Sequence, residues 1–190
     1  MIIGVTGHVG SGKTSFMLRY ASSFGREGLF VVAGLNDIPA MEGTDSFRWK
    51  VIDVLGAKGK LLPAVLDRIN CEANIFRADR RVLVVDSIAG YFAACHHELL
   101  ADSLITGEMY RHGLEEYRKQ LERALFSYQG NIFIISAEPA ELTPFMSTNE
   151  RVYHEQLGAF NRSVGLKCHQ WFVMTAGMAV DVKAIQFRGL

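Results

Sequence analysis

Short runs of apolar residues alternate along the chain with longer segments in which apolar residues recur at helical spacing. The short runs are rich in β-branched residues, which is typical of strands buried on both faces of a sheet. We predict six such strands, at Ile2–Val5, Leu29–Ala33, Val51–Val54, Val82–Val85, Ile132–Ile135 and Trp171–Thr175. A weaker alternation over Val182–Phe187 predicts an edge strand.

The intervening segments predict amphipathic helices. Their apolar faces lie within Phe16–Phe24, Leu62–Ile69, Ile88–Leu99, Leu114–Tyr128 and Val152–Val164. The first of these helices is expected to end at Gly25. Ser147 followed by Glu150 is a capping-box signature for the last of these helices. Strands that alternate with helices predict right-handed βαβ crossovers, and therefore an α/β fold with a mainly parallel sheet covered on both faces. The stretch Gly34–Lys50 has no clear period, so we expect an irregular and functional loop there.

Composition narrows the class of protein. A chain of 190 residues and 21.2 kDa is the size of one domain, so we expect a single domain over 1–190. With 49% hydrophobic and 21% charged residues, the chain is not intrinsically disordered. Twenty Lys+Arg balance twenty Asp+Glu, so no net positive field attracts nucleic acid or an anionic membrane. Any anion must therefore be bound by a local site.

The lack of a recognisable targeting signal and the spacing of the cysteines predict a cytoplasmic protein. No apolar run has the length of a membrane helix, and Met1 leads directly into Ile2–Val5 without the basic start of a signal peptide. The three cysteines, Cys71, Cys95 and Cys168, are too far apart in sequence for a C-x-x-C pair. We expect buried free thiols and a cytoplasmic protein.

The clearest chemical motif is a phosphate-binding loop directly after the first predicted strand. It matches G-x-x-x-x-G-K-S/T with Gly7, His8, Val9, Gly10, Ser11, Gly12, Lys13 and Thr14. Amides at the start of the helix that follows would bind phosphate, and glycines let the chain curl around it. Lys13 would reach the β- and γ-phosphates of ATP or GTP, and the Thr14 hydroxyl would ligate Mg²⁺. The alternative is a glycine-rich turn without a ligand.

Asp86 comes directly after the apolar run Val82–Val85, where a Walker B carboxylate would hold Mg²⁺. The alternative is a helix N-cap, because Ser87 and a helical pattern follow. Glu138 follows another strand and could orient or deprotonate an acceptor hydroxyl, or could be a capping or loop carboxylate. We therefore name Lys13, Asp86 and Glu138 as candidate catalytic residues, and Thr14 and Asp86 as candidate metal ligands.

Histidines give weaker signals. His96, His97 and Glu98 lack the spacing of a metal motif, so we interpret the two histidines as a surface pair. His8 could touch a phosphate or a base, or it could simply occupy a tolerant position of the loop. No Ser/His/Asp or Cys/His triad can be assembled from the spacing.

The residues resemble the adenosylcobinamide kinase/adenosylcobinamide-phosphate guanylyltransferase family of the late cobalamin pathway. The phosphate loop with Ser11 is similar to that family's G-x-x-x-S-G-K-S, and Val84–Ser87 with Leu99 and Leu100 is similar to its V-D-C-x-T…N-L-L. The C-terminal part resembles its succession of N-E-V-G, R-x-F/Y, G-x-x-N and G-I-P-x-x-x-K. The matching residues there are Glu138, Arg151, Tyr153, Gly158, Asn161, Gly177 and Lys183.

This resemblance implies a three-layer, RecA-like P-loop NTPase fold, a homotrimer, and a kinase that phosphorylates adenosylcobinamide. It also implies transfer of GMP through a guanylylated histidine. Here, however, the matching stretch Gly34–Trp49 is shorter and contains no histidine. Ala137, Pro139, Ala140 and Leu142 stand where the family has Asn and Gly, and Gly10 replaces a loop arginine. We therefore expect the kinase reaction rather than guanylyl transfer. The alternatives are a kinase for another small molecule and a nucleotide-binding protein without catalysis.

Overall fold

The computed structural model describes residues 1–33, 47–54, 56–72 and 81–186. The elements in chain order are β1 (Ile2–Gly7), α1 (Lys13–Ala21), the 3₁₀ turn η1 (Ser22–Phe24), β2 (Glu27–Val32), β3 (Arg48–Asp53), the 3₁₀ segment η2 (Gly56–Leu61), α2 (Leu62–Glu72), β4 (Arg81–Asp86), α3 (Ile88–Ala101), α4 (Gly107–Ser127), β5 (Asn131–Ile135), α5 (Thr148–Lys167), β6 (Gln170–Thr175) and β7 (Met178–Asp181). The predicted strands and helices are thus confirmed, with differences at the ends of the sheet.

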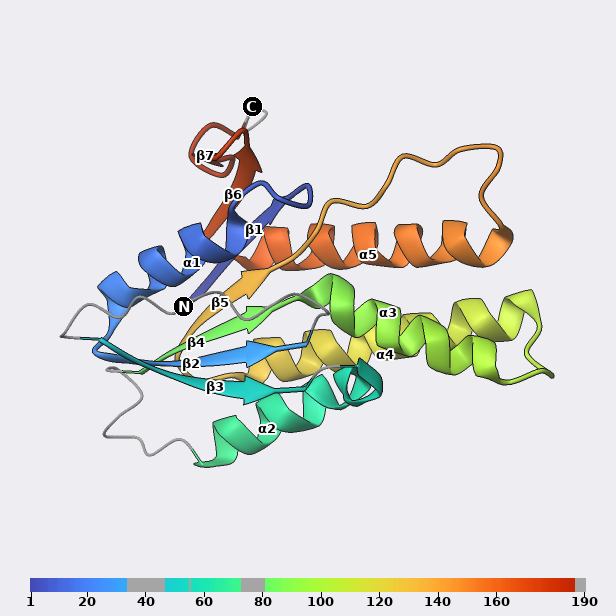
Figure 1. Ribbon diagram of the computed structural model, residues 1–190, viewed down its shortest axis with the longest axis horizontal. Helices are drawn as coiled ribbons and strands as arrows, with labels where there is room; N and C mark the ends of the chain where they lie inside the picture. The colour runs from blue at the N-terminus through green and yellow to red at the C-terminus, as the bar shows by residue number, and fades with distance from the viewer. Residues whose placement is uncertain (34–46, 55, 73–80, 187–190) are drawn as a thin grey trace.

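The strands of the described residues form one seven-stranded sheet in the order β3-β2-β4-β5-β1-β6-β7. Every neighbouring pair is parallel except β6 and β7. In Figure 1 the arrowheads of β2, β3, β4 and β5 point to the end of the molecule where α3 begins. Because β5 lies between β1 and β4, the carboxyl ends of these three strands meet at one edge, where ligands of α/β proteins bind.

Alternate residues of each central strand face opposite layers of helices. On β4, Val82 and Val84 pack in the same core cluster as Met17 and Ala21 of α1. Leu83 and Val85 pack in the second cluster, which also contains the buried faces of α2, α3, α4 and α5. The result is a helix–sheet–helix arrangement in three layers, so the predicted α/β class with a mainly parallel, doubly covered sheet is confirmed.

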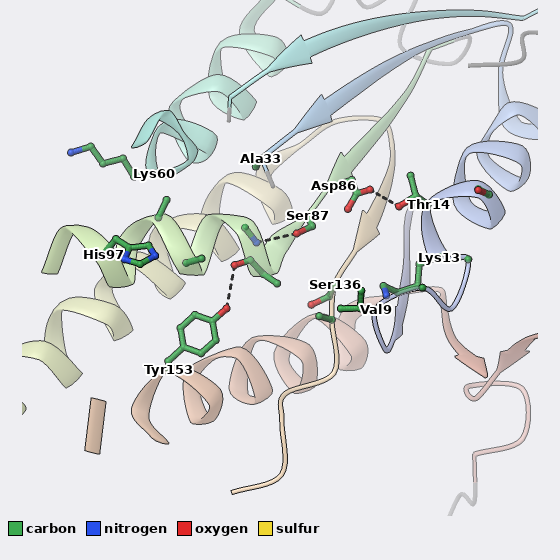
Figure 2. A pocket seen from close by; sticks show the side chains of 18 of the residues that line it. Val9, Lys13, Thr14, Ala33, Lys60, Asp86, Ser87, His97, Ser136 and Tyr153 are labelled. Atoms are coloured by element: carbon green, nitrogen blue, oxygen red, sulfur yellow. Dashed lines mark hydrogen bonds between the residues drawn. The ribbon is translucent and has the colours of Figure 1, made fainter. Parts of the chain in front are cut away.

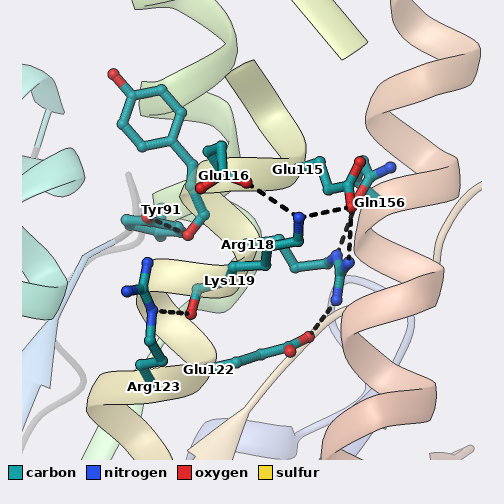
Figure 3. A network of polar contacts seen from close by, with 9 residues as sticks. Tyr91, Glu115, Glu116, Arg118, Lys119, Glu122, Arg123 and Gln156 are labelled. Atoms are coloured by element: carbon teal, nitrogen blue, oxygen red, sulfur yellow. Dashed lines mark hydrogen bonds and ion pairs between the residues drawn. The ribbon is translucent and has the colours of Figure 1, made fainter. Parts of the chain in front are cut away.

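Side chains between α4 and α5 hold the two longest helices together (Figure 3). The Arg118 guanidinium is only 17% exposed; it donates to Glu122 Oε1 at 2.7 Å and to Gln156 Oε1 of α5 at 2.9 Å. Lys119, on the exposed side, pairs with Glu115 and Glu116 at 3.0 Å each. Such exposed pairs contribute little, whereas the hydrogen bond of Arg118 to Gln156 joins α4 to α5 beside the apolar face that α5 buries in the core.

Two glycines in the sheet make room for tryptophans on neighbouring strands. A Cβ at Gly4 would lie 2.3 Å from the Trp171 ring of β6, and one at Gly28 would lie 2.4 Å from the Trp49 ring of β3. Gly4 pairs with Trp171 and Gly28 with Trp49 in the strand register. Each tryptophan therefore covers the sheet directly over a neighbouring backbone.

The capping box before α5 is confirmed, since Ser147 accepts from Glu150 N and the Glu150 side chain accepts from Ser147 N. The edge strand predicted at Val182–Phe187 is wrong. The strand ends at Asp181, and Phe187 lies outside the described residues. Ala176 and Gly177 both have positive φ, 49° and 78°, which is the two-residue turn that joins twisted antiparallel strands. This turn sets the pairing of β6 with β7 and places the strand four residues earlier.

The irregular stretch expected at Gly34–Lys50 is partly a strand. Its residues 34–46 lie outside the described residues, whereas Arg48–Lys50 belong to β3 and pair with β2. Backbone pairing with β2 makes this segment a strand although its side chains show no alternation.

The expectation of three buried thiols is wrong for Cys71, which is exposed near the end of α2. Cys95 and Cys168 are buried, and burial raises the pKa of both thiols to about 12. These two thiols therefore stay protonated and are not nucleophiles.

Candidate functional site

The phosphate loop connects β1 to α1 in the way that the motif requires. Gly10 and Gly12 have φ of 76° and 86°, in the left-handed region that favours glycine, and Gly12 is the N-cap of α1. α1 then begins at Lys13, so its free N-terminal amides face the loop. This geometry suits an anion, because amides and helix dipole act together.

Thr14 and Asp86, separated by 72 positions, come together at the sheet edge. The Thr14 hydroxyl donates to Asp86 Oδ2 at 2.6 Å, and Asp86 is only 4% exposed at the end of β4. Burial raises the pKa of Asp86, and the Thr14 hydrogen bond and the Lys13 charge partly oppose this rise. Hydroxyl and carboxylate oxygens are hard ligands, so this pair fits Mg²⁺ completed by phosphate oxygens and water.

The cap interpretation of Asp86 is wrong, because Ser87 fills that role. The Ser87 hydroxyl accepts from Gly90 N at 3.0 Å and is the N-cap of α3 (Figure 2). The Asp86 side chain instead points to Thr14. Since the helix is already capped, Asp86 is available for another task.

Lys13 lies over its own loop. Its ammonium donates to the His8 carbonyl at 2.6 Å and to Ser11 Oγ at 3.5 Å. Burial lowers the pKa of Lys13, and the negative charges of Asp86 and Glu138 oppose this effect. Lys13 therefore stands in the electrostatic field of both candidate carboxylates.

Glu138 is placed beside the loop rather than in the cavity described below. Its Oε2 lies 3.0 Å from His8 Nε2, with side chains 30% and 83% exposed. Glu138 is not among the described residues that line the cavity, although its neighbours Ser136 and Ala137 are. Its position therefore supports orientation of His8 and Lys13 more than contact with an acceptor.

A cavity of about 1060 Å³ begins at the phosphate loop and continues along α3 (Figure 2). Lys13 and Thr14 lie at one end, and Lys60 and His97 lie at the other. The described lining residues are Val9, Gly10, Gly12, Lys13, Thr14, Ser15, Ala33, Lys60, Asp86, Ser87, Ala89, Gly90, Ala93, Ala94, His97, Glu98, Ser136, Ala137 and Tyr153. The cavity is thus larger than the phosphate site and has room for a second ligand.

Sequence reasoning missed Ser136, which is 1% exposed and lines the cavity after β5. Ser136 Oγ donates to Asn161 Oδ1 at 2.7 Å, and Asn161 Nδ2 donates to the Ala137 carbonyl at 2.9 Å. Ser136 is the first polar residue after an apolar run, as Asp86 is after Val82–Val85. The same signal could have found it.

The interpretation of His96 and His97 as a surface pair is only partly right. His97 is exposed and lines the cavity, whereas His96 is half-buried. The His96 ring contacts Tyr110 and Tyr153 with centroids 5.7 and 5.5 Å away, and its Nδ1 is hydrogen-bonded to the Tyr110 hydroxyl. Glu98 pairs with Lys60 at 2.6 Å. Within the described part of the chain, no cluster of three His, Cys, Asp or Glu could hold a metal.

Several residues that carry the family resemblance have structural tasks. Tyr153 donates to the Ala89 carbonyl at 3.3 Å, and Arg151 donates to the Thr143 carbonyl at 3.1 Å. The Lys183 ammonium donates to carbonyls at the end of α5, including that of Gly165 at 2.9 Å. This is a C-terminal cap, which the α5 dipole favours.

Comparisons with known proteins bear on the fold alone. No model of a protein family and no curated protein matches the chain. A solved structure described as a prototypical ATPase from the type III secretion system of pathogenic bacteria is similar, with a TM-score of 0.52 and 14% identity. The match covers 96% of this chain and 57% of that one, so this chain spans little more than half of the ATPase's length.

The topology and this likeness together show a P-loop NTPase fold of the RecA-like kind. They do not extend to the cobalamin family. Among the helices described, not one combines the length and apolar character needed to cross a membrane.

Proposed function

We propose that this chain is a single-domain P-loop phosphotransferase that binds ATP or GTP with Mg²⁺ and phosphorylates a small-molecule alcohol. The observation that carries the proposal is the 2.6 Å contact of Thr14 with Asp86 beside Lys13, at the entrance to a cavity of about 1060 Å³. The motif alone predicts phosphate binding. The buried carboxylate and the adjoining space add the parts that a transfer reaction needs.

The loop amides and Lys13 would bind the β- and γ-phosphates and stabilise the charge that spreads over the transferred group. Thr14 and Asp86 would hold Mg²⁺, which would supply positive charge to neutralise the phosphates. Glu138 would hold His8 against the loop and balance the charge of Lys13 while the site is empty.

The reaction joins the acceptor hydroxyl oxygen to the γ-phosphorus. The bond from the γ-phosphorus to the bridging oxygen breaks, and its electron pair leaves on the nucleoside diphosphate. The hydroxyl proton passes to an oxygen of the transferred phosphoryl group, and the product monoester releases it to water. Because the transition state is loose, positioning and charge stabilisation contribute more than a strong base.

The extent of the cavity favours transfer over simple hydrolysis, because water needs no such volume. By resemblance, the acceptor is adenosylcobinamide, the kinase step is favoured over guanylyl transfer, and the assembly is a homotrimer. A kinase for another small molecule, or a nucleotide-binding protein without catalysis, is the alternative. The ATPase likeness is compatible with all three, because one fold serves many activities.

The decisive experiment follows γ-labelled ATP and GTP with Mg²⁺, with and without cobinamide. We expect label to appear in an organic monoester, and nucleotide consumption without any phosphorylated product would contradict the transferase proposal.

Lys13→Ala should weaken triphosphate binding by roughly 1–3 kcal/mol, because a charge-assisted contact is lost. Lys50→Ala, on the exposed face of β3, is the control, and equal affinity of both variants in calorimetry would refute the phosphate site.

A further inference from the structure

The cavity has an arm that leads away from the phosphate loop along α3. Ala89, Gly90, Ala93 and Ala94 form its wall on α3, and Ala33 at the end of β2 faces it. From Ala89 to His97 the helix rises by about 12 Å, at about 1.5 Å for each residue. The middle of the arm is therefore lined by methyl groups and backbone atoms. Its two ends are polar, with Ser87 and Ser136 at one end and Lys60, His97 and Glu98 at the other.

The near end of the arm adjoins the residues that would hold Mg²⁺ and the terminal phosphates of a nucleotide. Asp86 and Thr14 would hold Mg²⁺ beside the terminal phosphates, and the arm residue Ser87 directly follows Asp86. The arm therefore begins where the phosphoryl group is transferred.

Ser136 gives this end a defined polarity. Asn161 Nδ2 donates to the Ala137 carbonyl, which fixes the amide so that Asn161 Oδ1 receives the Ser136 hydroxyl proton. Ser136 Oγ is then left with lone pairs only. In a buried site, such an oxygen suits a ligand that donates a hydrogen bond, as an alcohol does.

The far end is lined by the ion pair of Lys60 and Glu98, which are 2.6 Å apart and have side chains 39% and 37% exposed. Gly59 places Lys60 there, since a Cβ at residue 59 would lie 3.0 Å from Ala94 Cβ. His97 is exposed beside this pair, and the Tyr153 hydroxyl is already committed to the Ala89 carbonyl. The charges of Lys60 and Glu98 cancel, so a charged head group would compete with one partner for the other, whereas a neutral head group need not.

We infer that this arm is the acceptor site and that it takes an alcohol with a slender apolar body and a neutral, carboxamide-like head group. The hydroxyl lies at Ser136 beside the γ-phosphate, the body lies along Ala93, and the head group lies against the Lys60–Glu98 ion pair. A carboxamide can donate to the carboxylate and accept from the ammonium without separating them. The inference rests on the proposed phosphotransferase function and names its substrate class, which is that of a kinase for another small molecule rather than for adenosylcobinamide.

The test uses ω-hydroxyoctanamide, whose extended length is comparable to the arm. Binding is measured by calorimetry in the presence of MgADP, and ω-hydroxyoctanoate and ω-amino-octanol carry the charged head groups. We expect the amide to bind about threefold or more tightly than either charged analogue. Equal binding of the three compounds, or no binding of the amide, overturns the inference.

Two phenylalanine variants on α3 locate the site. Ala93→Phe fills the arm and should weaken amide binding about tenfold or more, with MgADP affinity unchanged. Ala101→Phe, at the exposed end of the same helix and outside the cavity lining, should leave both unchanged. Thermal unfolding of both variants checks that they fold.

The outcomes separate the two proposals. If Ala93→Phe weakens MgADP binding as much as amide binding, the arm belongs to the nucleotide and the inference is wrong. If wild type binds MgADP and the amide does not bind, the inference fails while the phosphate site stands. If wild type binds neither MgADP nor MgATP, the proposed function itself fails.

Discussion

At the scale of single residues, burial acts on the two charges of the phosphate site in opposite directions. It raises the pKa of Asp86 and lowers the pKa of Lys13, so each charged form costs free energy to keep in place. A magnesium triphosphate would relieve both costs, because Asp86 gains a cation and Lys13 gains an anion. The site is therefore organised for a ligand that brings both charges.

Asp86→Asn tests the metal role directly. The amide can still accept from Thr14, so the fold should persist, but the charge that holds Mg²⁺ is lost. We expect turnover at limiting magnesium to fall about tenfold or more, with a smaller loss of nucleotide affinity, because charge develops mainly in the transition state. Asp67→Asn on the exposed face of α2 is the matched control. Normal turnover of Asp86→Asn would remove Asp86 from the mechanism.

His96 predicts a pH dependence of stability. Burial lowers its pKa from 6.5, with further lowering by His97 and His154 and opposition from Glu150. The unfolded chain then binds more protons than the folded one below about pH 6.5, so the free energy of unfolding should fall as the pH falls through this range. Chemical denaturation between about pH 5 and 8 measures the slope. His96→Gln should reduce it, whereas the exposed His112→Gln should not, and an unchanged slope in His96→Gln would contradict this account.

At the scale of elements, the contact of β1 with β6 depends on a missing side chain. Gly4→Ala would place a Cβ 2.3 Å from the Trp171 ring, so the ring or the strands must shift. We expect a loss of roughly 1–3 kcal/mol in the free energy of unfolding, as for other overpacked cores. Denaturant unfolding measures the loss.

Gly107→Ala is the matched control, because nothing lies within 4 Å of the added Cβ at the start of α4. That change should be neutral or slightly stabilising. Equal stability of Gly4→Ala and wild type would show that Trp171 repacks without cost.

At the scale of the whole molecule, the placement of the histidines argues against a covalent guanylyl intermediate. No histidine lies between Phe30 and Phe92, where the resembling family has its carrier. His8 contacts Glu138, and His97 lies at the end of the cavity opposite the phosphate loop. Nucleophilic catalysis needs an imidazole facing the α-phosphate, and positioning alone cannot replace it.

We therefore expect no acid-labile, alkali-stable adduct after incubation with α-labelled GTP and Mg²⁺. The same preparation should bind MgGTP, which serves as the positive control. Stoichiometric label on a histidine would contradict this prediction and support guanylyl transfer.

The strands, the helices and the phosphate loop could be predicted from the amino-acid sequence alone. Alternation, helical spacing and the run Gly7–Thr14 are each contained within one local segment, so neighbouring residues were enough to predict them. The predictions for the edge strand and for Arg48–Lys50 were less accurate, because strand pairing and not local pattern settled them.

Which polar groups meet depends on how the elements pack against one another. The order of the strands brings Asp86 to Thr14, the packing of α5 brings Asn161 to Ser136, and the close approach of η2 to α3 brings Lys60 to Glu98. These partners lie 72, 25 and 38 positions apart, and their side chains alone carry no signal of pairing. The physical reason is that hydrophobic periodicity specifies which face of an element is buried but not which element it is buried against.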